Sequence, residues 1–198
     1  TNKETYEVIC KYKKENIIFV IKEISEFKVY KYNWNEQHKI DYEKNKHSTN
    51  LYMVWNEKTN FVIDAIKRNF FGSYYFFWCD IGAFRDKNRM KLFVNWPDPK
   101  NVKTIPSGKI AVLQINSFNK NELELKDGFP KPFDKKDRIG GTIFGGHKED
   151  WRKFSDVYYG VLEKFFELGR FAGKDQNVLN TIVTTNPEIL HIIEGNRK

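Results

Sequence analysis

The chain has 198 residues, of which 40% are hydrophobic, and this is enough for one sizeable core, so a single domain over residues 1–198 is expected. No apolar run reaches the roughly 18 residues that a membrane-spanning helix needs, and two cysteines are too few for a secreted disulfide framework, so the composition favours a cytoplasmic protein without a membrane span. The formal charge of +8 comes from basic residues that alternate with acids, which is more typical of a solvated surface than of a nucleic-acid-binding one.

The first part of the chain contains two apolar clusters, at residues 6–10 and 17–21. The second cluster is a continuous run of Ile, Phe and Val, which predicts a buried β-strand. Residues 32–50 are polar and predict a loop or an irregular helix, in which His38 and His47 are expected at the surface.

A short strand over residues 51–54 and a helix over residues 55–70 are predicted next. The apolar residues of the helix recur at helical spacing, and Asn56 is the candidate for its N-terminal cap. After a Gly-Ser break, residues 74–79 read Tyr-Tyr-Phe-Phe-Trp-Cys, a continuous aromatic run that is typical of a strand buried on both faces.

The second half of the chain alternates loops, strands and helices. In chain order we expect a loop over residues 86–108, a strand over 109–115, a loop over 117–139, a helix over 149–168, a helix from Asp175 and a strand over 189–193. The helix over 149–168 has the clearest pattern, because its apolar residues form one stripe. Strands that alternate with helices indicate an α/β fold with a central mixed β-sheet flanked by helices.

The first candidate site is Asp80, which ends the aromatic strand. Ligand crevices of open α/β sheets lie at the C-terminal ends of strands, and an ionised carboxylate there needs a partner. Asp80 can hold Mg²⁺ or Mn²⁺, which in turn binds a diphosphate. The sequence leaves open whether Arg85 pairs with phosphate or neutralises Asp80 or Asp86. It also leaves open that Asp80 only caps the next turn.

The second candidate site is a glycine-rich segment. Gly140, Gly141, Gly145 and Gly146 flank a short β-type core. Such glycines either let another molecule approach the backbone closely or form tight turns, and both interpretations stand at this point.

The third candidate site is a helix start with Asp175 followed by Gln176, although an Asp there is also an ordinary N-cap. His191 lies in the last apolar stretch, where a histidine is more typical of a core residue than of a metal ligand. No Cys or His spacing indicates a zinc site.

Taken in order, these segments resemble the nucleotide-sugar glycosyltransferases of the GT-A type. In the retaining family 8 enzymes, a strand ending in Asp-X-Asp precedes a Gly-containing strand, a Trp-bearing helix and Asp-Gln-X-X-Leu-Asn. The matching segments here are residues 78–82, 140–146 with Trp151, and 175–180. The HtrL/YibB-like family, in which Asp-X-Gly-X-Phe-Arg replaces Asp-X-Asp, is the closer match over residues 48–193. Glycosyltransferases of large algal viruses share the general pattern.

The resemblance implies a GT-A-like domain that acts as a metal-dependent glycosyltransferase, with Mn²⁺ or Mg²⁺ as cofactor. Such an enzyme moves a sugar from a nucleotide-sugar donor, with UDP as the expected nucleotide, to a glycan or glycoprotein acceptor and retains the anomeric configuration. The resemblance assigns metal binding to Asp80 and His191, donor binding to Lys58, Arg85, Gly140, Gly141, Gly145 and Gly146, and catalysis to Gln176 and Asp175.

Two features depart from that pattern. Gly82 stands where the second carboxylate of the metal motif is expected, which leaves the metal one ligand short. Little sequence precedes residues 17–21 to form the strand that holds the nucleotide base, unless residues 6–10 supply it, so this strand is incomplete or rebuilt. Two other functions stay open: a nucleic-acid-binding module with a basic, aromatic surface, and an inactive relative that binds the sugar nucleotide without turnover.

Overall fold

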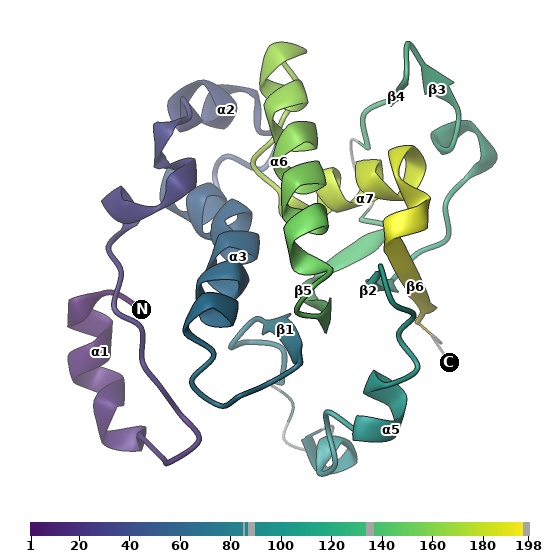
Figure 1. Ribbon diagram of the computed structural model, residues 1–198. Coiled ribbons are helices and arrows are strands. Elements are labelled where there is room, and N and C mark those ends of the chain that lie inside the picture. Colours follow the sequence, from purple (N-terminus) through teal and green to yellow (C-terminus); the bar gives the residue numbers. More distant parts are fainter. Residues whose placement is uncertain (85, 87–89, 134–136, 196–198) are drawn as a thin grey trace.

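The structure is a computed structural model that describes residues 1–84, 86, 90–133 and 137–195 (Figure 1). Its centre is a four-stranded sheet with the order β1-β5-β2-β6. The bounds are Tyr75–Cys79 for β1, Ile110–Gln114 for β2, Ile139–His147 for β5 and Leu190–Glu194 for β6. The pair β2 and β6 is parallel, and the other two pairs are antiparallel. The predicted α/β class with a central mixed sheet is confirmed.

Helices surround this sheet, and a small hairpin projects from it (Figure 1). In the part of the chain that the structure describes, the α-helices are α1 (Lys3–Ile9), α2 (Trp34–Ile40), α3 (Thr49–Arg68), α5 (Pro99–Val102), α6 (Trp151–Glu167) and α7 (Asp175–Thr185). The hairpin pairs β3 (Leu125–Lys126) with β4 (Phe129–Pro130). None of the helices in the described ranges is both long and apolar enough to cross a membrane.

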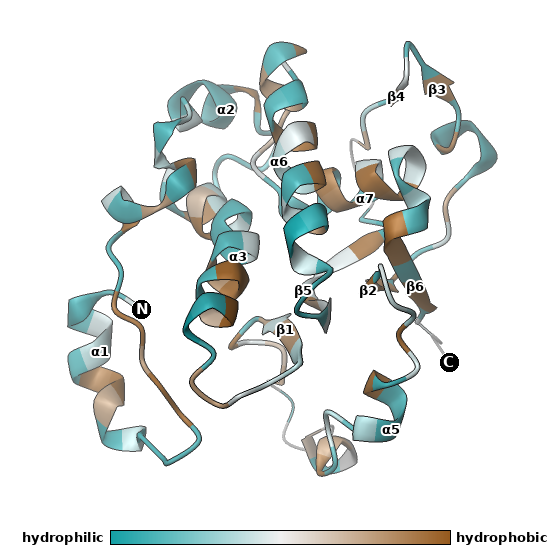
Figure 2. Ribbon diagram, viewed as in Figure 1, coloured by the Kyte–Doolittle hydropathy of each residue, from teal (hydrophilic) through white to brown (hydrophobic). Residues whose placement is uncertain are grey.

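The core lies where α3, α6 and α7 pack on the sheet. On α6 the predicted stripe is confirmed: Trp151, Phe154, Tyr158 and Leu162 recur every three or four residues and are all buried. Figure 2 shows hydrophobic and hydrophilic segments alternating along α6, as this spacing requires. Burial of these large side chains is the main force that holds the helix on the sheet.

The N-terminal region differs from the predicted one. Residues 6–10 belong to α1 and its continuation, and residues 17–21 are not a strand. Ile18, Val20 and Ile21 remain between 39% and 47% exposed. An apolar run becomes a strand only where a neighbouring strand pairs with it, and the sheet offers none at this place.

Helix α3 also begins earlier than predicted. The strand predicted over residues 51–54 is wrong, because α3 starts at Thr49 and Ser48 accepts a hydrogen bond from Leu51 N–H as its cap. Asn56, the predicted cap, is fully buried in the middle of the helix. Helix α3 buries polar as well as apolar side chains, so its apolar residues alone do not show the helical repeat in the sequence.

Two predicted details of the strands are corrected. Strand β1 lies at an edge of the sheet and is only half-buried, so the prediction of burial on both faces is wrong. The glycine-rich segment is the central strand β5 rather than a set of turns. A Cβ at Gly145 would overlap the Phe76 carbonyl, and one at Gly146 would lie 2.8 Å from the Lys109 carbonyl. These glycines therefore let three strands pack closely.

Candidate functional site

The candidate site is built around Lys58, whose side chain is only 3% exposed. Its Nζ lies 2.7 Å from Asp175 Oδ2, 3.1 Å from Asp80 Oδ1 and 2.8 Å from the Gly141 carbonyl oxygen. The four residues come from α3, the end of β1, β5 and the start of α7. We call them the Lys58 cluster. Four residues that the sequence marked at three separate segments and on the preceding helix thus meet at one point.

Asp80 is held at the strand end by backbone and side-chain contacts. Its N–H donates to the Thr142 carbonyl at 2.8 Å, and Trp78 Nε1 donates to Asp80 Oδ1 at 2.6 Å. The carboxylate is 34% exposed and points to Lys58. The Asp80 carbonyl accepts from Ala83 N–H and closes the next turn, and no backbone N–H of the described residues donates to the Asp80 carboxylate.

Asp175 is the buried partner. Burial raises the pKa of its carboxyl above the usual value, while the charge and hydrogen bond of Lys58 act to lower it. Its Oδ1 accepts from Gln176 N–H at 2.9 Å. A Cβ at Gly141 would overlap the Asp175 carboxylate, so only glycine fits at that position. The N-cap of α7 is Lys174, and Asp175 is the first residue of the helix.

Gln176 lies next to the Lys58 cluster and is half-buried. Its carboxamide has no hydrogen-bond partner among the residues that the structure describes, whereas its backbone N–H is bonded to Asp175. The Gln176 side chain is therefore available for a ligand. Of the four glycines marked in the sequence, Gly141 belongs to the Lys58 cluster, whereas a Cβ added at Gly140 would lie 3.4 Å from the Ile115 side chain.

His191 is not brought to this site. The sheet registers Phe77 with Gly145, Gly145 with Ala111, and Ala111 with His191, so His191 lies three strands away from β1. At about 4.8 Å per strand this is roughly 14 Å. The predicted pairing of His191 with Asp80 at a metal is therefore wrong. Arg85, the other predicted donor-binding residue, lies outside the described residues.

The side chains present do not fit a divalent metal in this arrangement. Mg²⁺ and Mn²⁺ take about six oxygen ligands. Among the described residues, no group of three His, Cys, Asp or Glu side chains is placed to hold a metal ion. The position between the Asp80 and Asp175 carboxylates is already taken by the Lys58 ammonium.

Sequence reasoning missed Asn56 as a part of this region. Asn56 Nδ2 donates to the carbonyls of Ala172 at 3.2 Å and Gly173 at 3.0 Å, and Asn56 Oδ1 accepts from Tyr158 at 2.9 Å. Asn56 thereby fixes the segment that leads into Asp175. Asn56 follows the buried Tyr52 by one helical turn, and this spacing becomes a signal only when residues 51–54 are read as helix rather than strand.

The two N-terminal histidines are not free surface residues, which corrects their predicted placement. Asp41 Oδ2 accepts from the Tyr52 hydroxyl at 2.5 Å and lies 2.7 Å from His47 Nδ1, while His38 Nδ1 lies 3.0 Å from the same hydroxyl. Burial alone raises the pKa of Asp41, but hydrogen bonds from Tyr52, Glu43 N–H and His47 hold it below its usual value. This network anchors the loop between α2 and α3.

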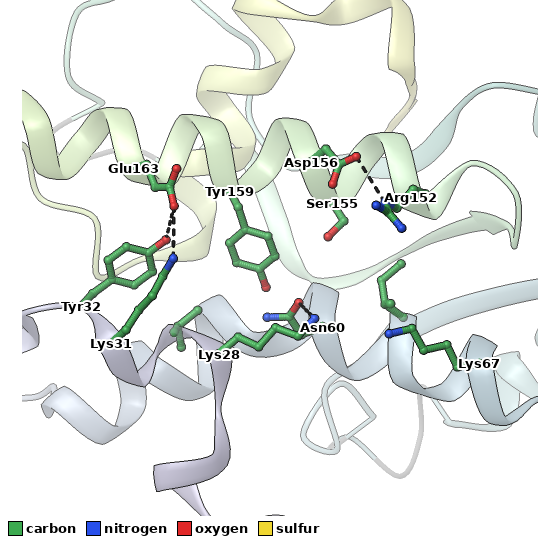
Figure 3. Close-up of a pocket in the computed structure, with 12 residues that line it drawn as sticks. Lys28, Lys31, Tyr32, Asn60, Lys67, Arg152, Ser155, Asp156, Tyr159 and Glu163 are labelled. Carbon is green, nitrogen blue, oxygen red and sulfur yellow. Dashed lines mark hydrogen bonds and ion pairs between the residues drawn. The ribbon is translucent and has the colours of Figure 1, made fainter.

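Away from the Lys58 cluster, a groove lies between α3, α6 and the short 3₁₀ helix Lys28–Lys31 (Figure 3). Its volume is about 570 Å³, and we call it the α3–α6 groove. Tyr159 points into its centre, and at one end Glu163 accepts from Tyr32 at 2.9 Å and pairs with Lys31 at 3.4 Å (Figure 3). No sequence motif marked this groove, because three separate segments form it.

Comparison with known proteins gives one match. No curated protein and no solved structure matches the chain. The model of the HtrL_YibB family, described as bacterial protein of unknown function, matches residues 2–197. The chain belongs to the HtrL_YibB family.

Proposed function

We propose that the chain is a glycosyltransferase that moves a sugar from a nucleotide-sugar donor, with UDP as the nucleotide, to a glycan or glycoprotein acceptor. The observation that carries this proposal is the convergence of Asp80, Lys58 and Asp175 beside the free carboxamide of Gln176. A GT-A-like domain and a cytoplasmic location belong to the same proposal.

The proposed chemistry uses these side chains as follows. The bond between the anomeric carbon and the diphosphate oxygen breaks, the acceptor oxygen bonds to that carbon from the same face, and the acceptor proton passes to the leaving diphosphate. The Gln176 carboxamide oxygen faces the positive charge that develops on the sugar. Lys58 holds Asp175 in place, and Asp175 fixes the Gln176 backbone. The configuration is retained.

The expected Mn²⁺ or Mg²⁺ enters none of these steps, because the side chains of the Lys58 cluster do not fit it. A metal requirement is therefore tested directly. We expect UDP to raise the melting temperature in EDTA, since a ligand at about 100 times its Kd adds roughly 2.7 kcal/mol to the stability of the folded state. GDP and CMP are the nucleotide controls, and each nucleotide is also measured with Mn²⁺.

The second measurement follows the release of UDP from a panel of UDP-sugars with and without acceptor glycans. Replacing Gln176 by Ala should lower the transfer rate at least about tenfold while it changes UDP affinity little, because the carboxamide acts on the transition state. Gln114→Ala is the matched control, since Gln114 is also half-buried but lies outside the Lys58 cluster. Equal losses of rate and affinity would contradict the proposed role of Gln176.

Two outcomes would favour the other functions. A melting shift with UDP but no turnover of any UDP-sugar would indicate an inactive relative. No shift with any nucleotide, together with oligonucleotide binding that weakens steeply with salt, would indicate a nucleic-acid-binding module.

A further inference from the structure

Three elements bring oxygen atoms to one point in the Lys58 cluster. The carboxylates of Asp80 and Asp175 and the carbonyl of Gly141 lie 3.1, 2.7 and 2.8 Å from Lys58 Nζ. Carboxylate and carbonyl oxygens are the ligands that hard cations such as Mn²⁺ and Ca²⁺ prefer. The geometry is that of a cation site, and its cation is an ammonium.

The ammonium is matched to this site in number and in position. It has three N–H donors, and three oxygen-bearing groups surround it. Its stem rises from the 20-residue helix α3, and it is almost fully shielded from solvent. Lys58 therefore has no N–H left over for the nucleotide-sugar donor, which the resemblance expects it to bind.

Charge keeps divalent cations out of the occupied site. A divalent cation can enter only if the Lys58 ammonium leaves, and a buried ammonium without a partner is strongly disfavoured. Because the ammonium is tethered to α3, it also competes at a high effective concentration. A neutral side chain at this position would leave two carboxylates and a carbonyl facing an uncharged gap.

We propose that Lys58 is the built-in cation of this site and replaces a divalent metal, so that removing its charge creates a divalent-cation site. Lys58 is then a positioning residue that holds Asp80 and Asp175 together. The consequence for catalysis rests on the proposed function: a glycosyltransferase with this site binds its nucleotide-sugar donor without an added metal. The cation site itself does not depend on that function.

The experiment titrates Mn²⁺ into EDTA-treated protein without nucleotide, and follows free Mn²⁺ by electron paramagnetic resonance and the melting temperature in parallel. The wild-type protein should bind no Mn²⁺ at this site and show no melting shift. Lys58→Met should melt lower in EDTA, and it should then gain one bound Mn²⁺ that the wild type lacks and melt higher when Mn²⁺ is added. A purely structural role of Lys58 predicts the lower melting temperature but no gain of Mn²⁺ binding.

Two controls make the result specific. Lys58→Met combined with Asp175→Asn should lose the gained Mn²⁺ binding. Lys174→Met removes a second, more exposed lysine, which pairs with the single carboxylate of Glu43 at 2.7 Å, and this variant should gain no Mn²⁺ binding. Should Lys58→Met not fold, Lys58→Gln takes its place, because the amide keeps N–H donors without the charge.

Two results would overturn the inference. One is a folded neutral variant of Lys58 that gains no Mn²⁺ binding. The other is a wild-type protein that binds one Mn²⁺ and loses it in Asp80→Asn. The titration contains no nucleotide, so neither result bears on whether UDP binds, and a failure to bind UDP leaves the Mn²⁺ result standing.

Discussion

Two lysine–carboxylate pairs of the molecule differ in how far water reaches their charged groups. At the Lys58 cluster, the side chains of Lys58 and Asp175 are 3% and 6% exposed and their charged atoms are 2.7 Å apart. In the α3–α6 groove, Lys31 and Glu163 are 65% and 51% exposed and 3.4 Å apart (Figure 3). Both are lysine–carboxylate pairs, but only the buried pair has lost the water that would otherwise stabilise each charge separately.

A third ion pair lies between these extremes. Lys174 and Glu43 are 13% and 24% exposed and 2.7 Å apart, and they join the loop after α2 to the start of α7. The three pairs form a series of increasing exposure within one small protein. The series predicts that the cost of breaking a pair falls in the same order.

The largest effect is expected for Lys58→Met. Removing one partner of a buried pair leaves an uncompensated charge and costs about 3–5 kcal/mol. Urea unfolding in EDTA measures this loss as a lower midpoint at an unchanged slope. A loss below about 1 kcal/mol would mean that the Asp80 and Asp175 carboxylates find other partners, and burial would then not explain the difference between the two pairs.

Gly141→Ala tests the same cluster through packing. The added Cβ would overlap the Asp175 carboxylate, so either strand β5 or the carboxylate must shift, at a cost of about 1–3 kcal/mol. Gly160→Ala on α6 is the matched control, because a Cβ there meets nothing within 4 Å. In an exposed helix interior this change should stabilise by about 0.5–1 kcal/mol. If both substitutions shifted the unfolding midpoint in the same direction, the close contact between Gly141 and the Asp175 carboxylate would be contradicted.

The sequence allowed some of this architecture to be predicted, namely those elements whose pattern reflects burial directly. The helix now seen as α6 and the strands β2 and β6 were predicted because their apolar residues pack on one core. Residues 17–21 have the same composition as a buried strand but no partner to pair with, and pairing is a property of the whole chain.

The candidate site was predicted in its parts but not in its arrangement. The sequence marks Lys58, Asp80 and Asp175 separately, with Lys58 expected to bind the donor and Asp80 a metal. Spacing along the chain does not reveal that two carboxylates lie on either side of one ammonium. The α3–α6 groove was missed altogether, because its walls come from segments more than a hundred residues apart.

The intermediate pair is best tested through pH. The hydrogen bond from Lys174 is the main reason that the pKa of Glu43 falls from 4.5 to about 2 in the folded protein. Because the pKa is lower in the folded state, the ionised carboxylate adds stability above pH 4.5, and this stability is lost as the pH falls toward about 2. Melting temperatures of wild type and Glu43→Gln should therefore converge over this range. A constant difference between them would contradict the ion-pair contribution.

The smallest effect is expected for Lys31→Met in the α3–α6 groove. Both partners remain hydrated when the pair breaks, so the loss should be about 0–1 kcal/mol. The Tyr32 hydroxyl also donates to Glu163 at 2.9 Å and keeps that carboxylate in place after Lys31 is removed. Urea unfolding at about 0.1 M and 1 M salt should give nearly equal midpoints for the wild type and Lys31→Met. The difference should be smallest at 1 M salt, where the Debye length is about 3 Å and exposed charges are screened most strongly. A loss that approaches that of Lys58→Met would show that exposure does not set the strength of these two pairs.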